Sequence, residues 1–247
     1  MMPLIVQKYG GSSLSTTEKI KKVANQIMAR KKEGYNLAVV VSAMGDTTDQ
    51  LEQLAYEISP NPCRREMDML LSAGERISMA LLAIALKEKG EESISFTGSQ
   101  SGIVTDATHT NAQILEIKAD RLLAELTKGR VVIVAGFQGV STTKEVTTLG
   151  RGGSDVTAVA LAVRLGAIQC EFYKDVDGVY TKDPHKFKDA KKIEACDYDD
   201  ILKLVQAGAV VFHPRAIEIA QKHSLPLRIT STFKPDRGTL IQRHSHV

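Results

Sequence analysis

The sequence predicts an α/β fold with a largely parallel sheet, on three observations. Apolar runs of strand length alternate with helical patterns along the 247 residues. Several of these runs show no polar alternation, which is typical of strands covered on both faces. Glycine-rich and polar loops follow the strands, and neither a linker nor a repeat divides the chain. The length would suit one large domain or two small ones, and the unbroken alternation favours a single domain over residues 1–247.

The first elements are the most clearly marked. Residues 4–8 form a short apolar run that predicts a buried strand, and Gly10 and Gly11 follow it. A helix should then begin at a capping box made by Ser15 and Glu18. Its apolar positions recur at helical spacing from residue 20 to 28, and it should end near residue 34. Residues 37–42 predict the second buried strand.

The same alternation continues to the end of the chain. We expect helices at 65–86, after 152–155, at 198–207 and at 214–222, where Pro214 takes the first helical position. Strands are expected at 93–96, 131–135, 169–173 and 227–230. The polar segments 99–102 and 141–144 are interpreted as loops that each lead into the next βα unit.

Composition excludes several classes of protein. A net charge of +3, with no basic run interleaved with aromatic residues, argues against a nucleic-acid partner. The longest apolar stretch, 77–86, is too short to span a membrane. The first residues lack a basic leader, so we expect a cytoplasmic protein. Cys63, Cys170 and Cys196 have no ligand spacing and are expected to be reduced, and no metal site built from side chains is predicted.

Three loops hold most of the candidate chemistry. Residues 8–13 place Lys8 beside two glycines and a helix start, an arrangement that suits a phosphate but also an ordinary turn. Residues 147–155 set Arg151 among glycines, where its guanidinium could hold a carboxylate in a bidentate contact. A helix cap alone does not explain that arginine. Residues 173–184 say little by themselves. P-loop, GxGxxG and protein-kinase signatures are absent, which argues against those mechanisms.

Five motifs in these and neighbouring segments occur together in one known family. They are KYGGSS at 8–13, VSAMGDTTD at 41–49, AGERIS at 73–78, GRGGSD at 150–155 and DVDGVYTKDP at 175–184. The five motifs occur in the order seen in aspartate kinases. Over about residues 6–241, the chain therefore resembles the catalytic domain of that family. The resemblance implies the amino-acid-kinase fold, a three-layer α/β/α sandwich with a mainly parallel central sheet. It also implies transfer of the ATP γ-phosphoryl group, with Mg²⁺, to the side-chain carboxylate of L-aspartate to give 4-phospho-L-aspartate, an early step of lysine, threonine and methionine biosynthesis.

The resemblance also implies residue roles. Lys8 and Asp155 would be the catalytic pair, Arg151 would bind the α-carboxylate of aspartate, and Glu75 would bind its ammonium group. The alternative for Glu75 is an ordinary surface residue of a helix. The substrate set is Ser42, Thr48, Glu75, Arg151, Gly152, Gly153 and Ser154. The nucleotide set is Lys8, Tyr9, Gly10, Gly11, Ser12, Tyr173, Lys174, Asp175, Val179, Tyr180, Thr181, Lys182, Asp183 and Pro184.

The sequence departs from the family pattern on the nucleotide side. Val210 stands where aspartate kinases usually have a lysine, and His185 where they often have an arginine. Lys174 replaces a small hydroxyl residue and could supply a missing cation. No regulatory ACT domains are expected within 1–247, which leaves open a lack of feedback control, a separate regulatory chain or a truncation. We expect a homodimer.

Two other functions remain open from the sequence. The first is a catalytically weak aspartate-binding or regulatory subunit, in which Val210 costs activity. The second is a related amino-acid kinase with another acid substrate. N-acetylglutamate fits less well, because an acidic Glu75 offers nothing to an acylated amine.

Overall fold

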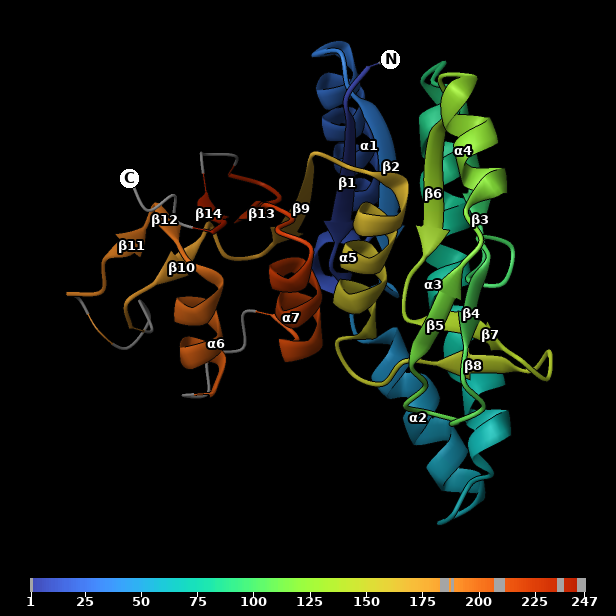
Figure 1. Cartoon of the computed structure of the whole chain (residues 1–247). Coiled ribbons are helices and arrows are strands. Elements are labelled where there is room, and N and C mark those ends of the chain that lie inside the picture. Colours follow the sequence, from blue (N-terminus) through green and yellow to red (C-terminus); the bar gives the residue numbers. More distant parts are fainter. Residues whose placement is uncertain (1, 183–186, 188, 207–211, 235–237, 244–247) are drawn as a thin grey trace.

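Eight strands form the central sheet of the computed structural model, which describes residues 2–182, 187, 189–206, 212–234 and 238–243. Their order is β12-β14-β13-β9-β1-β2-β6-β3, and every described pair is parallel except β13 with β14 (Figure 1). The strands are β1 (Leu4–Tyr9), β2 (Asn36–Val41), β3 (Ser93–Phe96), β6 (Val131–Ala135), β9 (Gln169–Lys174), β12 (Ala195–Cys196), β13 (Leu227–Ser231) and β14 (Thr239–Ile241).

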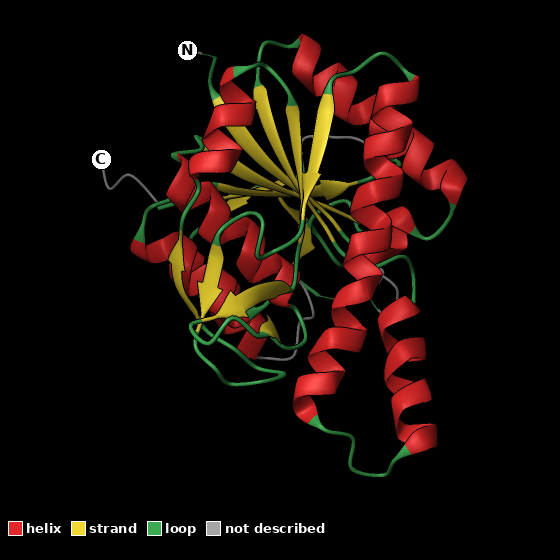
Figure 2. Cartoon of the chain, turned by 90° about the vertical axis from the view of Figure 1, so that its right-hand side faces the viewer, coloured by secondary structure: helices red, strands yellow, loops and turns green. Residues whose placement is uncertain are grey.

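Helices cover both faces of this sheet, as Figure 2 shows from the side. The helices of the described residues are α1 (Thr17–Lys32), α2 (Thr47–Ile58), α3 (Arg64–Glu88), α4 (Asp120–Thr127), α5 (Gly153–Leu165), α6 (Tyr198–Gln206) and α7 (Pro214–Lys222), of which α2 packs on α3. Side chains of β2 alternate between two cores: Leu37 and Val39 pack with α1 and α3, whereas Ala38 and Val40 pack with α4, α5 and α7. The predicted three-layer sandwich and its two-sided strands are therefore confirmed.

A second, smaller sheet was not predicted. Its order is β5-β4-β7-β8, with β4 (Ile103–Thr105), β5 (Ile114–Ile117), β7 (Gln138–Ser141) and β8 (Val146–Thr148). The prediction that segments 99–102 and 141–144 lead into βα units is wrong, because the first enters β4 and the second is the turn of the β7–β8 hairpin. These strands have three or four residues, too few for a clear alternation of polar and apolar positions.

The start of α1 also differs from the prediction. Thr16, not Ser15, is the N-cap, and its side chain accepts a hydrogen bond from the backbone N–H of Lys19. Ser15 instead donates to the carbonyl of Ser12, within the turn that joins the short 3₁₀ helix η1 (Gly11–Leu14) to α1. Adjacent hydroxyl residues can each cap a helix, and the local sequence did not distinguish them.

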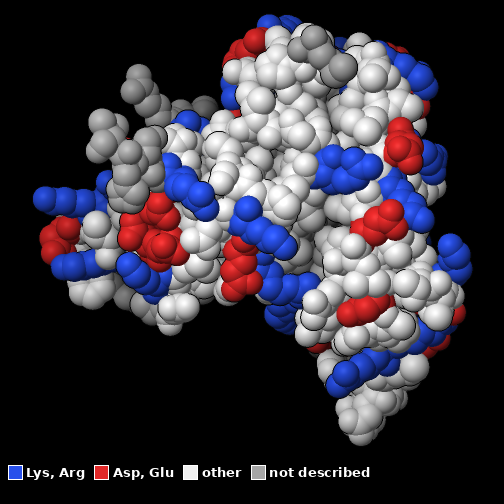
Figure 3. Space-filling model, in the orientation of Figure 1, with Lys and Arg blue, Asp and Glu red and all other residues white. Residues whose placement is uncertain are grey.

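Helix α3 is long and apolar enough to cross a membrane by length and composition alone. Half of that apolar window is buried within the protein, where Leu82 and Leu86 pack in the core shared with α1. This is the behaviour of a core helix. On the face seen in Figure 3, positive and negative side chains are interspersed and no large patch of one sign forms.

Candidate active site

A cleft of about 870 Å³ lies where β1 and β2 end, between the central sheet, α2, α3 and the small sheet. Nine residues predicted from sequence line it: Lys8, Gly11, Ser42, Thr48, Glu75, Arg151, Gly152, Ser154 and Asp155. They come from four separate segments of the chain. The carboxyl ends of parallel strands meet at this edge, which is where ligands bind in open α/β sheets.

A buried carboxylate joins two lysines at one side of the cleft. Lys8 Nζ lies 2.8 Å from Asp155 Oδ1, and Lys174 Nζ lies 3.5 Å from Asp155 Oδ2. Burial alone would raise the pKa of Asp155, but the ammonium groups of Lys174 and Lys8 outweigh it and lower this pKa to about 2. Asp155 is therefore a permanent anion that holds both cations in place.

The loop after β1 approaches the loop after β2 so closely that glycine is required. A Cβ on Gly11 would lie 2.8 Å from the carbonyl oxygen of Gly45 and 2.9 Å from that of Ala43. The backbone N–H of Gly45 donates to the Gly11 carbonyl, which fixes the contact. Gly10 lies near Lys8, since a Cβ there would be 3.8 Å from Nζ. The glycines thus bring backbone beside the lysine, as a phosphate site needs.

Glu75 is buried in the wall of the cleft and is not a surface residue. A Cβ on Gly74 would lie 2.8 Å from the Ala43 side chain, so Gly74 lets α3 approach the loop after β2. Glu75 Oε1 accepts the backbone N–H of Ala43 at 3.1 Å, while Oε2 has no hydrogen-bond partner among the described residues. Burial raises the pKa of Glu75 to about 7, despite that N–H and nearby Lys8. An unpartnered buried carboxylate oxygen suits a ligand cation.

Arg151 reaches across the mouth of the cleft to α2. Its side chain is 78% exposed, with Nη1 2.9 Å from Asp49 Oδ1 and Nη2 2.8 Å from Glu52 Oε2. Gly152, in the left-handed conformation (φ 75°), is the N-cap of α5, so the helix does not use Ser154 or Asp155 as its cap. The guanidinium makes one contact to each of two carboxylates of α2, and the predicted bidentate contact with a substrate carboxylate stays a prediction.

Tyr9 and Tyr173 were predicted beside the nucleotide, but their rings lie on the opposite face of the sheet from Lys8. They stack at 4.6 Å between centroids, and Tyr9 is fully buried in the core beneath α1 and α3. Side chains alternate along a strand, so Lys8 and Tyr9 must face opposite ways. Only the backbone of these two tyrosines can contribute to the cleft.

The rest of the predicted nucleotide segment lies away from the cleft. Asp175 is exposed, and Val179–Tyr180 forms β10, which pairs with β11 (Lys192–Ile193) in the lobe at the left of Figure 1. Thr181 pairs through its backbone with Lys191, and Lys182 pairs with Asp189. None of these residues lines the cleft. Asp183, Pro184, His185 and Val210 lie outside the described residues.

Sequence reasoning missed the part of the cleft that the small sheet supplies. Phe137, Thr148, Thr110 and Asn111 line it, and none of the four belongs to a quoted motif. Thr148 lies in the candidate loop 147–155 and precedes GRGGSD by two positions. Gly153 and Ser12 were predicted but do not line the cleft. A Cβ on Gly153 would lie 2.7 Å from that of Leu149, so this glycine serves packing.

A family model identifies the class of protein to which this fold and cleft belong. Residues 3–231 match the model of the amino acid kinase family, and the chain belongs to that family.

Within the family, curated relatives at about half identity over nearly the whole chain are aspartokinases. The chain is 51% identical over 244 residues to aspartokinase 2 of Bacillus subtilis, covering 99% of this chain and 60% of that protein. The structure of aspartate kinase from Synechocystis superposes with a TM-score of 0.88 at 46% identity, covering 98% of this chain and 40% of that one. The structure of E. coli aspartokinase III in complex with aspartate and ADP superposes with a TM-score of 0.89 at 25% identity. That match covers 98% of this chain and 65% of the other. The chain thus spans about three-fifths of the length of the curated relatives.

Proposed function

We propose that this chain is an aspartate kinase, which transfers the γ-phosphoryl group of ATP to the side-chain carboxylate of L-aspartate and forms 4-phospho-L-aspartate. The observation that carries the proposal is one cleft whose walls combine two complementary groups of side chains. The first is Lys8 on Asp155, whose other oxygen contacts Lys174 beside the cleft, and the second is the unpartnered oxygen of Glu75 together with Arg151. The similarity to aspartokinases supports the choice of acceptor.

The positive charges of Lys8 and Lys174 would offset the repulsion between the two negatively charged reactants. A carboxylate must attack a polyphosphate, and two unit charges about 4 Å apart repel by about 4 kcal/mol at an effective dielectric constant of 20. Lys8 and the backbone N–H groups near Gly10 and Gly11 would meet the charge that develops on the transferred group. Asp155 would keep the ammonium group of Lys8 oriented, so that little reorganisation is needed during transfer.

Glu75 and Arg151, which form the acceptor end of the cleft, would bind the two charged groups of the amino acid. Glu75 would pair with the substrate ammonium, which replaces the missing partner of Oε2. Arg151 would bind the α-carboxylate in exchange for Asp49 or Glu52, with Ser42, Thr48 and Ser154 contributing hydroxyl groups. An acid without a free amine would leave Glu75 buried and unpaired, which disfavours it.

Mg²⁺ would arrive with the nucleotide. Within the described ranges, no three acidic, histidine or cysteine side chains cluster as a metal cage. Asp155 is already occupied by two lysines. In kinases Mg²⁺ is commonly bound through substrate phosphates and water with few protein ligands, so the cleft suits MgATP as the substrate. The ion would neutralise phosphate charge.

A hydroxamate assay tests the proposal, because hydroxylamine traps an acyl phosphate. We expect product with L-aspartate and MgATP, and little with succinate or N-acetyl-L-aspartate, which lack the free ammonium group. Preference for another amino acid would support the related-kinase alternative. Aspartate binding by calorimetry without product would support the catalytically weak subunit. The expectations of a cytoplasmic location and of a homodimer belong to the same proposal.

A further inference from the structure

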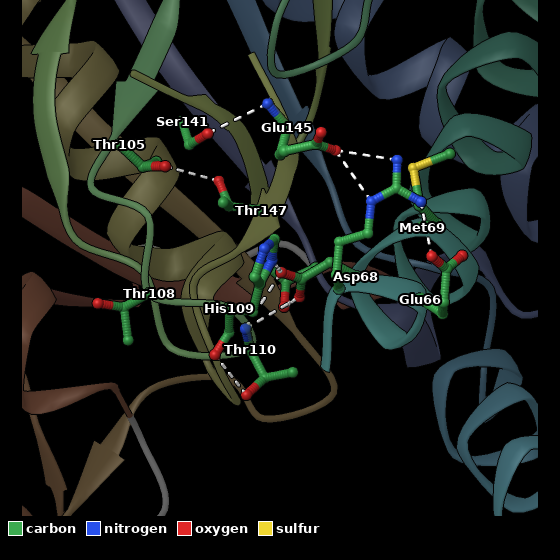
Figure 4. A network of polar contacts seen from close by, with 12 residues as sticks. Glu66, Asp68, Met69, Thr105, Thr108, His109, Thr110, Ser141, Glu145 and Thr147 are labelled. Carbon is green, nitrogen blue, oxygen red and sulfur yellow. Dashed lines mark hydrogen bonds and ion pairs between the residues drawn. The ribbon is translucent and has the colours of Figure 1, made fainter. Parts of the chain in front are cut away.

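A second buried carboxylate, which the proposed mechanism does not use, lies beside the cleft. Asp68 is on α3 seven residues before Glu75 and is fully buried. Figure 4 shows the side chains that converge on it from the small sheet. His109 Nδ1 lies 2.6 Å from Oδ2, and the backbone N–H of Thr110 donates to Oδ1 at 3.1 Å. Thr148 Oγ1 donates to Oδ1 at 2.5 Å.

These contacts make Asp68 an anchor between three parts of the cleft wall. A buried carboxylate is stable only when its oxygens accept hydrogen bonds, and here donors come from the β4–β5 loop and from the end of β8. Because a carboxylate ion only accepts, the proton on the imidazole of His109 must be on Nδ1. His109 is thus a donor at the edge of the site and itself stays outside the cleft lining.

The anchored loop is in turn connected to the segment that carries Arg151. Thr110 has φ 68°, a conformation that costs free energy for a β-branched residue and is held by the contact with Asp68. The backbone N–H of Ala112 donates to the Thr148 carbonyl at 2.9 Å. Asn111 packs on Gly150, where a Cβ would lie 3.1 Å from its Oδ1. Gly150 directly precedes Arg151.

We infer that Asp68 and His109 are positioning residues for the acceptor end of the cleft. They hold the loop at 109–112, and through it residues 148–151, in the arrangement that presents the Arg151 guanidinium to the substrate carboxylate. The inference rests on the proposed function for the identity of that substrate. It extends the acceptor site to a pair of side chains that do not touch the reacting atoms.

The test compares two variants of His109 with a matched control. His109→Leu removes the donor and should raise KM for aspartate about tenfold while leaving KM for ATP within twofold. His109→Asn keeps a donor close to the position of Nδ1 and should restore most of the affinity. Thr105→Val breaks another buried contact of the small sheet, the 2.6 Å contact between Thr105 and Thr147 hydroxyls. It should lower Tm but leave both KM values unchanged.

Hydrogen–deuterium exchange supplies a readout that does not depend on activity. Exchange in 109–112 and 149–153 should be faster in His109→Leu than in the wild type, and close to the wild type in His109→Asn and Thr105→Val. Equal changes in both KM values, no difference between the Leu and Asn variants, or unchanged exchange in 149–153 would overturn the inference. If the wild-type chain phosphorylates no acceptor, the proposed function fails, and the exchange arm still decides whether this pair positions the loop.

Discussion

At the ends of β1 and β9, each face of the central sheet carries a buried carboxylate that is surrounded by donors, but only one of the two clusters lies beside the cleft. On the α5 face, Asp155 lies between Lys8 and Lys174. On the α1 face, Glu171 lies among Arg30, Gln7 and Tyr173 at 2.6, 3.0 and 3.0 Å. Each face therefore contains one buried carboxylate with cationic or polar donors. The alternation of side chains along two strands produces both clusters from neighbouring residues.

The two clusters differ in whether their donors can also form hydrogen bonds to a ligand in the cleft. Glu171 is saturated by groups that are themselves packed in the core, and the stacked tyrosines beside it have their pKa values raised by burial, so they stay neutral. Lys8, by contrast, lines the cleft and has three donor hydrogens, only one of which is needed for Asp155. The comparison assigns phosphate chemistry to the α5 face and stability to the α1 face.

Removing the cation from the α5 face should have the largest effect. Lys8→Ala should lower kcat by about 10²-fold or more, the scale of losing one preorganised electrostatic donor in a transition state. Its Tm should change little, because Lys174 still neutralises Asp155. Steady-state kinetics and a thermal melt measure both. A kcat within a few-fold of the wild type would refute the role of Lys8.

Glu171→Gln is the mirror experiment on the α1 face. It removes the charge that Arg30 and Tyr173 contact, at a cost of about 2 kcal/mol in the free energy of unfolding. For a chain of this size, Tm should fall by about 4–8 °C. Activity measured well below the Tm should remain within about twofold of the wild type. A large loss of kcat without a fall in Tm would remove the distinction between the two faces.

Parts of the fold and of the cleft could be predicted from the sequence, and other parts could not. Strands with continuous apolar runs, helices α1, α3 and α5, and nine of the residues that line the cleft were predicted because they lie in periodic segments or quoted motifs. The stacking of Tyr9 on Tyr173 was not, although strand alternation from Lys8 already placed Tyr9 on the other face.

The small sheet and its cleft residues depend on contacts between distant segments. Asp68 meets Thr110 and Thr148, which are 42 and 80 positions away along the chain. No local pattern marks such a pairing, because each partner alone is an ordinary polar residue of a helix, loop or short strand. Glu75 shows the same limit: the motif assigned it to the substrate site, but nothing in its helix position predicted that it is buried.

The pH dependence of the acceptor end should separate it from the nucleotide end. Because the pKa of Glu75 is about 7, kcat/KM for aspartate should rise about tenfold per pH unit below 7 and level off above it. The raised pKa also means that the native state holds this proton more tightly than the unfolded chain. Glu75 therefore lowers the free energy of unfolding as pH rises from about 4.5 to 7.

Glu75→Gln is the control for that profile. It should flatten the rise in kcat/KM for aspartate and make the protein relatively more stable above pH 7, while KM for ATP stays unchanged across the range. A wild-type profile with no inflection near pH 7, or one that persists in Glu75→Gln, would count against the assignment of the ammonium site.

The smallest effect is expected where the α5 face departs from the family pattern. Lys174 contacts the same carboxylate as Lys8, and our hypothesis is that its charge compensates for the lysine that the family pattern has at position 210. If it does so, Lys174→Thr should lower kcat/KM for ATP by up to about tenfold, equivalent to about 1.4 kcal/mol. Val210→Lys alone should change little, and in the double mutant it should recover most of the loss. Additive effects of the two substitutions would contradict compensation, and thermal melts of all four proteins would identify a lysine at 210 that only destabilises the fold.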